Sequence, residues 1–215
     1  MNYSLNSTIL NSGPSIKNAV ILCHGYGGDG KDISIVAHYW KNFLSDTLFI
    51  CPDAPEVCKV NPQGFQWFDL MDQSEDEILS KSLIAEEKLN KFIDEVKENN
   101  KLKTDQISLV GFSQGCMISL QTALKRKDKI KCLIGYSGKI LNSYHLNKNI
   151  HSRPEIYLMH GDIDNVVPIN NLLEAKEFFS KQKYEINTKI FKNCEHRIPT
   201  EGLSIGLEFL KKNFI

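Results

Sequence analysis

Residues 107–115, I-S-L-V-G-F-S-Q-G, restrict the fold of this chain more than any other segment. The apolar, β-branched run 107–110 predicts a strand, and the helical pattern of residues 114–125 predicts a helix directly after it. Gly111, Ser113 and Gly115 form G-x-S-x-G between the two. In a tight strand-to-helix turn, glycines are needed where a Cβ would clash with neighbouring backbone. The segment therefore predicts a nucleophile elbow that presents Ser113.

Other apolar runs alternate with segments of helical period along the whole chain. The predicted strands lie at residues 19–23, 48–51, 107–110, 132–136, 156–160 and 186–191. Predicted helices cover 33–44, 114–125, 170–180 and 201–211, and a long surface helix starts near Ser74, where Ser74 and Glu77 form a capping box. This alternation is typical of an α/β fold with a mostly parallel central sheet flanked by helices. Without a linker-like segment, we expect one domain over residues 1–215.

Charge and cysteine usage exclude several functions. Lys plus Arg and Asp plus Glu both number 26, so no net field attracts nucleic acid. No run reaches the roughly 18 apolar residues of a membrane span, and no secretory leader is recognisable, so we expect a cytoplasmic protein without integral membrane association. The six cysteines form no CxxC pair and three fall in or at the end of predicted strands, which favours buried, reduced thiols over disulfides or a metal site.

A serine nucleophile requires a histidine and an acid, in the chain order Ser, Asp or Glu, His for this kind of elbow. His196 follows the last predicted strand in N-C-E-H-R-I-P-T and is the candidate base, whereas His160 ends the strand before the acid loop. That loop, G-D-I-D-N-V-V-P, offers Asp162 and Asp164. We favour Asp164, which lies further along the loop, and expect Asp162 to cap the turn.

Acyl transfer also needs hydrogen-bond donors for a developing oxyanion. The backbone N–H of Gln114, directly after the serine, is one candidate. The glycine-rich loop C-H-G-Y-G-G-D-G after the first core strand supplies the other at Tyr26. A phosphate-binding loop is the alternative for this segment, but its glycine spacing matches neither nucleotide-binding pattern.

The segment 52–73 is irregular, carries three of the seven prolines, and is predicted to be a long functional loop. Its aromatic residues suggest an apolar wall for the substrate, with Phe65 and Trp67 as contacts. The alternative is that Trp67 and Phe68 only anchor the loop on the core.

Taken in order, the motifs H-G-Y-G-G-D-G, P-D-A-P, Q-W-F-D, G-F-S-Q-G, Y-S-G, G-D-I-D-N-V-V-P and the late His196 resemble the carboxylesterase/phospholipase family of α/β-hydrolases. That family includes acyl-protein thioesterases and small bacterial carboxylesterases. The resemblance implies an α/β-hydrolase fold without a large cap domain, a triad of Ser113, Asp164 and His196, an oxyanion hole at Tyr26 and Gln114, and no cofactor. The chain departs from the family at Glu195, where members usually carry glycine.

These observations predict a serine esterase that acts on a small acyl ester or thioester, with an acylated protein or a lysophospholipid as further substrate classes. A serine peptidase on the same fold and a non-catalytic binding scaffold are the alternatives. The acyl length and the oligomeric state stay open.

Overall fold

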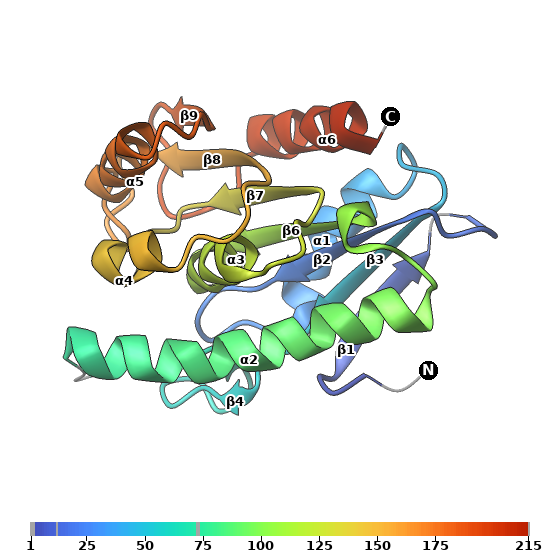
Figure 1. Cartoon of the computed structure of the whole chain (residues 1–215), viewed down its shortest axis with the longest axis horizontal. Helices are drawn as coiled ribbons and strands as arrows, with labels where there is room; N and C mark the ends of the chain where they lie inside the picture. The colour runs from blue at the N-terminus through green and yellow to red at the C-terminus, as the bar shows by residue number, and fades with distance from the viewer. Residues whose placement is uncertain (1–2, 12, 72–73, 215) are drawn as a thin grey trace.

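The computed structural model describes residues 3–11, 13–71 and 74–214, which are built around one seven-stranded sheet (Figure 1). The strand order is β1-β3-β2-β6-β7-β8-β9, and only β1 runs antiparallel to its neighbour. The strands are β1 (Ser7–Asn11), β2 (Asn18–Cys23), β3 (Thr47–Pro52), β6 (Ile107–Phe112), β7 (Cys132–Tyr136), β8 (Glu155–Gly161) and β9 (Asn187–Phe191). A short hairpin of β4 (Glu56–Val57) and β5 (Phe65–Gln66) lies outside this sheet.

Helices cover both faces of the sheet (Figure 1). Helices α1 (Gly30–Trp40) and α6 (Thr200–Phe214) pack on one face. Helices α2 (Glu75–Asn99), α3 (Gln114–Lys125) and α5 (Asn170–Lys181) pack on the other, where the short α4 (Ser143–Lys148) adjoins α3. Two apolar cores result, one on each face, which is why β2 and β3 are buried almost continuously instead of alternating. This is the predicted α/β-hydrolase fold.

The predicted elements are present with small differences at their ends. All six predicted strands occur, and residues 132–136 and 114–125 match exactly. The Ser74–Glu77 capping box begins α2 as expected. The sequence prediction omitted β1, the β4–β5 hairpin within the predicted loop 52–73, and α4.

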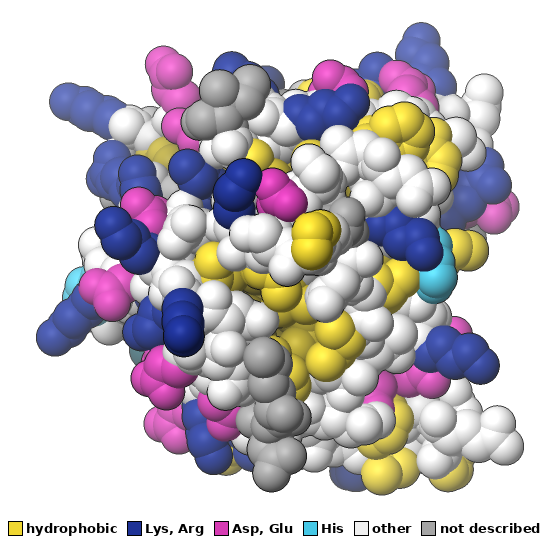
Figure 2. Space-filling view, turned by 90° about the vertical axis from the view of Figure 1, so that its right-hand side faces the viewer, with side chains coloured by type: hydrophobic (Ala, Val, Ile, Leu, Met, Phe, Trp, Pro, Cys, Tyr) yellow, Lys and Arg dark blue, Asp and Glu magenta, His cyan; other side chains and the backbone are white. Residues whose placement is uncertain are grey.

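The strand order reverses between β2 and β6, because the chain goes from β2 outward to β3 on one side, crosses back to β6, and continues to β7, β8 and β9 on the other side. In open α/β sheets, ligands bind at the carboxyl ends of the strands at such a switch point. The loop after β2 and the turn after β6 therefore meet at the position where the fold favours a site. Figure 2 views the opposite end, where acidic and basic side chains are interspersed around a hydrophobic patch.

Candidate active site

Ser113 occupies the turn between β6 and α3 in a strained backbone conformation. Its φ is 53° and its ψ is −118°, a region that residues with a Cβ rarely adopt. The Ser113 N–H donates to the carbonyl of Tyr136 at 2.8 Å, which holds the turn against β7. A Cβ on Gly115 would lie 2.0 Å from the Cys23 carbonyl oxygen, and one on Gly111 would lie 2.4 Å from that of Gly115. The flanking glycines are thus required by close backbone packing, as the motif predicts.

Helix α3 starts immediately after Ser113 and directs its positive end at the turn. The Ser113 hydroxyl makes no capping hydrogen bond to α3, while its carbonyl accepts from the N–H groups of Cys116 and Met117. Backbone N–H groups at a helix start stabilise negative charge. Gln114 is the first residue of α3, so its N–H has no acceptor within the helix.

The loops after β8 and β9 bring Asp164 and His196 together. Nδ1 of His196 lies 2.8 Å from Oδ2 of Asp164, and the Asp164 side chain is fully buried. Asp162, the other predicted candidate, instead accepts a hydrogen bond from the Cys194 N–H at 3.3 Å. Within the described residues, Asp164 is the one of the two aspartates that contacts His196.

The imidazole of His196 lies beside the elbow. Its ring centroid is 4.9 Å from that of Phe112, the residue directly before Ser113, and its side chain is 17% exposed. Ser113, His196 and Asp164 therefore occupy one end of the sheet. Glu195 is exposed, and its carbonyl accepts from the Arg197 N–H.

The electrostatics of Asp164 favour its ionised form. Burial raises the pKa of Asp164, but the hydrogen bonds from His196 and from the Val167 N–H lower it by more, so its pKa lies below the usual value of a carboxyl group. The Asp164 carboxylate only accepts hydrogen bonds, so Nδ1 of His196 carries the proton in their contact.

The loop after β2, which contains Tyr26, is fixed by the buried histidine before it. His24 Nδ1 donates to the Gly25 carbonyl at 2.7 Å, and Nε2 accepts the Ala54 N–H at 2.9 Å. Burial lowers the pKa of His24, so it stays neutral and keeps both bonds. Desolvation, with a contribution from Cys58, raises the pKa of Tyr26 to about 12, so its phenol is also neutral.

The segment 52–73 carries Phe65, Trp67 and Phe68 and is called the aromatic loop below. The side chain of Gln114 joins this loop to the elbow. Its Oε1 accepts the Trp67 N–H at 2.9 Å, and its Nε2 donates to the Phe68 carbonyl at 2.6 Å. The indole N–H of Trp67 donates to the His24 carbonyl at 3.0 Å. Trp67 and Phe68 are fully buried, in agreement with an anchoring role for both, whereas Phe65 is half-buried.

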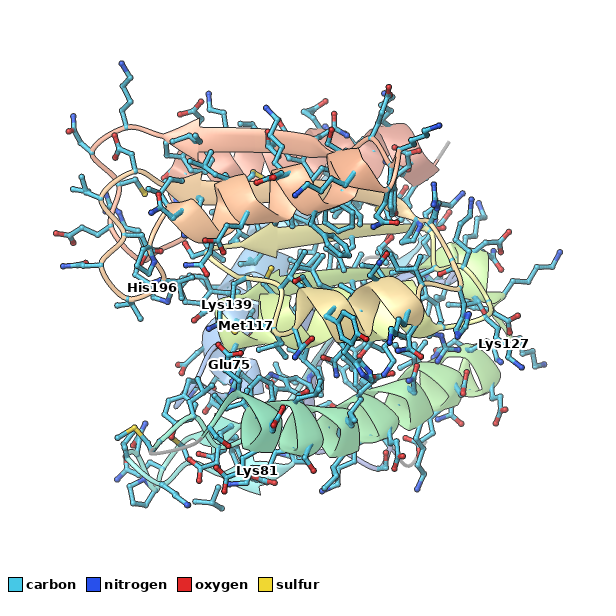
Figure 3. The ribbon with its side chains drawn as sticks, turned by 60° about the vertical axis from the view of Figure 1, so that its left-hand side comes forward. Glu75, Lys81, Met117, Lys127, Lys139 and His196 are labelled. Atoms are coloured by element: carbon cyan, nitrogen blue, oxygen red, sulfur yellow. The ribbon has the colours of Figure 1, made fainter. Side chains whose placement is uncertain are left out.

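A cleft of about 850 Å³, within the size range of ligand sites, lies between the start of α2, residues 139–144 and α5, and Ser113, Asp164 and His196 are not among the residues that line it. Gly138 links it to the elbow, because a Cβ there would lie 3.3 Å from the Ser113 carbonyl, and the next residue, Lys139, lines the cleft. Figure 3 shows His196, Lys139, Met117 and Glu75 at one end of the molecule. The walls are mostly polar and come from residues 139–144, Asn147, the start of α2 at Glu75, and α5 from Asn171 with Gln182.

The described residues contain no group of three His, Cys, Asp or Glu side chains arranged to hold a metal ion. Within the same ranges, no helix is long and apolar enough to cross a membrane. The six cysteines are buried and free, as the sequence predicts.

Sequence reasoning did not assign functions to His24 or His160. The position of His24, directly before the glycine-rich turn, could have indicated a role. The same holds for His160, which ends the strand before the acid loop. In each case the hydrogen-bond partner is a backbone group that no side-chain pattern reveals.

The strained serine elbow and the adjoining Asp–His pair on this sheet define a serine hydrolase of the α/β-hydrolase fold. Residues 5–214 match the family model described as phospholipase/carboxylesterase, and the chain belongs to that family. It is similar to acyl-protein thioesterase 1 of Saccharomyces cerevisiae, with 30% identity over 92% of this chain and 93% of the yeast protein.

Solved structures agree with this assignment. The crystal structure of esterase PE8 superposes with a TM-score of 0.92 and 32% identity, over 97% of this chain and 99% of the other. The structure of Zea mays acyl-protein thioesterase 2 shares the fold, with a TM-score of 0.80 and 19% identity over 98% and 99% of the two chains. The chain is therefore a serine hydrolase of an ester- and thioester-cleaving family.

Proposed function

We propose that this chain is a serine esterase that cleaves acyl esters or thioesters through Ser113, His196 and Asp164. The contact of 2.8 Å between His196 Nδ1 and the buried Asp164 carboxylate, beside the strained Ser113 turn, carries the proposal. In this arrangement the Ser113 hydroxyl attacks the acyl carbonyl while Nε2 of His196 takes its proton.

The tetrahedral intermediate places negative charge on the former carbonyl oxygen. The N–H of Gln114 at the start of α3 and the N–H of Tyr26 in the loop after β2 are the proposed donors to this oxyanion. His196 then returns its proton to the leaving alcohol or thiol, and the acyl group stays on Ser113. Water, activated by the same histidine, attacks the acyl-enzyme and releases the acid.

The proposed substrates are small acyl esters and thioesters, with acylated proteins and lysophospholipids as members of the same chemical class. Phe65, half-buried on the loop that Gln114 holds, is the proposed contact with the acyl group. The six buried, free thiols support a reducing compartment, the cytoplasm, as the place of action.

The proposal is tested by measuring hydrolysis of p-nitrophenyl esters of increasing acyl length beside an acyl thioester. Ser113→Ala and His196→Ala are each expected to abolish turnover while the proteins stay folded. The double variant should be little worse than either single one, because triad members act as a unit. Substantial hydrolysis by purified Ser113→Ala would refute the mechanism.

A further inference from the structure

The Asp164 carboxylate has four polar neighbours, one of which the proposed mechanism does not use. Oδ1 accepts the N–H groups of Val166 at 3.0 Å and Val167 at 2.9 Å. Oδ2 lies 2.8 Å from His196 Nδ1 and 3.4 Å from Nε2 of a second histidine, His160. Both histidines therefore approach the same carboxylate oxygen.

The proton on His160 can be placed from its neighbours. Nε2 of His160 lies 2.7 Å from the Val167 carbonyl oxygen and next to Asp164 Oδ2. A carbonyl and a carboxylate oxygen only accept hydrogen bonds, so Nε2 carries the proton and donates mainly to Val167. The side chain is 1% exposed, and burial lowers the pKa of His160, so the ring is neutral.

These bonds hold the turn of residues 164–167 through both backbone polar groups of Val167. The N–H of Val167 donates to Asp164, and the carbonyl of Val167 accepts from His160. His160 belongs to β8, which lies between β7 and β9 within the sheet. The orientation of the Asp164 carboxylate is thereby tied to a rigid strand instead of depending on a surface loop.

We propose that His160 is a positioning residue of the triad, whose Nε2–H holds the turn 164–167 against β8 and so fixes the carboxylate that orients His196. This inference rests on the proposed function and adds a residue to it. Asp164 and His196 are the titratable groups in its electrostatic surroundings, and Cys116 of α3 and Lys139 line the same small cavity of about 10 Å³. That volume is at the lower limit for a single water molecule.

Replacement of His160 separates positioning from packing. His160→Leu removes the donor but fills the site with an apolar side chain. His160→Gln offers an amide N–H in place of the imidazole N–H. With p-nitrophenyl acetate, the Leu variant is expected to lose about 10- to 100-fold in kcat, the scale caused by small misplacements of catalytic groups, with KM changed less than about twofold. The Gln variant should recover most of this loss. The exposed His151→Leu serves as the control and should match the wild type. A folded Leu variant with wild-type kcat would overturn the proposal.

A spectroscopic measurement has one outcome that the wild type alone decides, and a second that compares it with the His160→Leu variant. In protein labelled with ¹⁵N-histidine, His160 should be the neutral Nε2–H tautomer, and His196 should show a downfield Nδ1–H proton from its bond to Asp164. In His160→Leu that His196 proton should shift or broaden, whereas a packing role alone would leave it in place. A Nδ1–H tautomer for wild-type His160 would overturn the proposal.

The rate of covalent labelling by a fluorophosphonate distinguishes this inference from the proposed function. Labelling of wild-type Ser113, with slower labelling of His160→Leu, supports both. Equal rates in the two proteins would reject the role of His160 alone. Absence of labelling in the folded wild type would reject the proposed function, and this inference with it.

Discussion

At the scale of single residues, the site depends on backbone that the fold holds in place. Ser113 keeps a φ of 53° although such a conformation costs a non-glycine residue on the order of 1–3 kcal/mol. The bond to Tyr136 and the close packing of Gly115 on Cys23 maintain it. The result is a hydroxyl that α3 does not use for capping.

The acid of the proposed triad is tested by the two aspartates of one loop. Asp164→Asn should lower kcat by about 10⁴, because an amide favours the wrong tautomer of His196. Asp162→Asn is the matched control. The Asp162 side chain accepts the Cys194 N–H, so this variant should change kcat little while lowering stability slightly. Steady-state kinetics on both variants decide the assignment, and an exchange of the two phenotypes would make it wrong.

Cys116 lies three residues after Ser113, so a thiol mechanism needs a separate test. Burial raises the pKa of Cys116 to about 12, so fewer than about one thiol in 10⁴ is ionised near pH 7.5. Iodoacetamide should therefore leave esterase activity intact under conditions that fully alkylate free glutathione. Rapid stoichiometric inactivation, mapped to Cys116 by mass spectrometry, would contradict this.

At the scale of elements, the turn and helix boundaries that position the serine follow local rules, and the sequence predicts them well. The glycines of the elbow and the Ser74–Glu77 capping box are local chemistry, readable within a few residues. The edge strand β1 depends on pairing with β3, some 40 residues away, so local pattern does not reveal it. The same reason hides the contacts of Gln114 with Trp67 and Phe68, and of His160 with Val167.

The aromatic loop contains Phe65, which is suited to substrate contact, and Trp67, one of its two buried anchoring residues. Phe65→Ala should raise KM for longer p-nitrophenyl esters by about fivefold, as expected from losing part of an aromatic contact, with little change in stability. Trp67→Ala should lower the free energy of unfolding by about 3–5 kcal/mol, because it empties a fully buried site and removes the bond to His24. Urea unfolding and kinetics on the two variants measure this, and the opposite pattern would reverse the roles.

At the scale of the whole molecule, two buried histidines make stability depend on pH. Burial lowers the pKa of both His24 and His160 below the value of about 6.5 that they have in the unfolded chain. Below that pH the unfolded state binds more protons than the folded state, so stability is lost as pH falls from about 6.5 towards the lowered values. Asp164, whose pKa lies below the usual value of a carboxyl group, contributes to the loss of stability only at still lower pH.

The free energy of unfolding should therefore decrease between pH 7.5 and 5.5, by up to about 1.4 kcal/mol for each histidine at the lower pH. In His160→Gln this decrease should be smaller, and in the exposed His38→Gln it should equal that of the wild type. Urea unfolding at a series of pH values provides the measurement. A wild-type stability that is constant over this range would contradict buried, neutral histidines.

Identification of the residue that a fluorophosphonate modifies tests the central claim most directly. Intact-mass analysis of the folded protein should show one adduct per chain, and peptide mapping should place it on Ser113. Ser113→Ala should show none, and Asp164→Asn should react much more slowly than the wild type. An adduct on another residue, or no adduct on the folded wild type, would contradict the account.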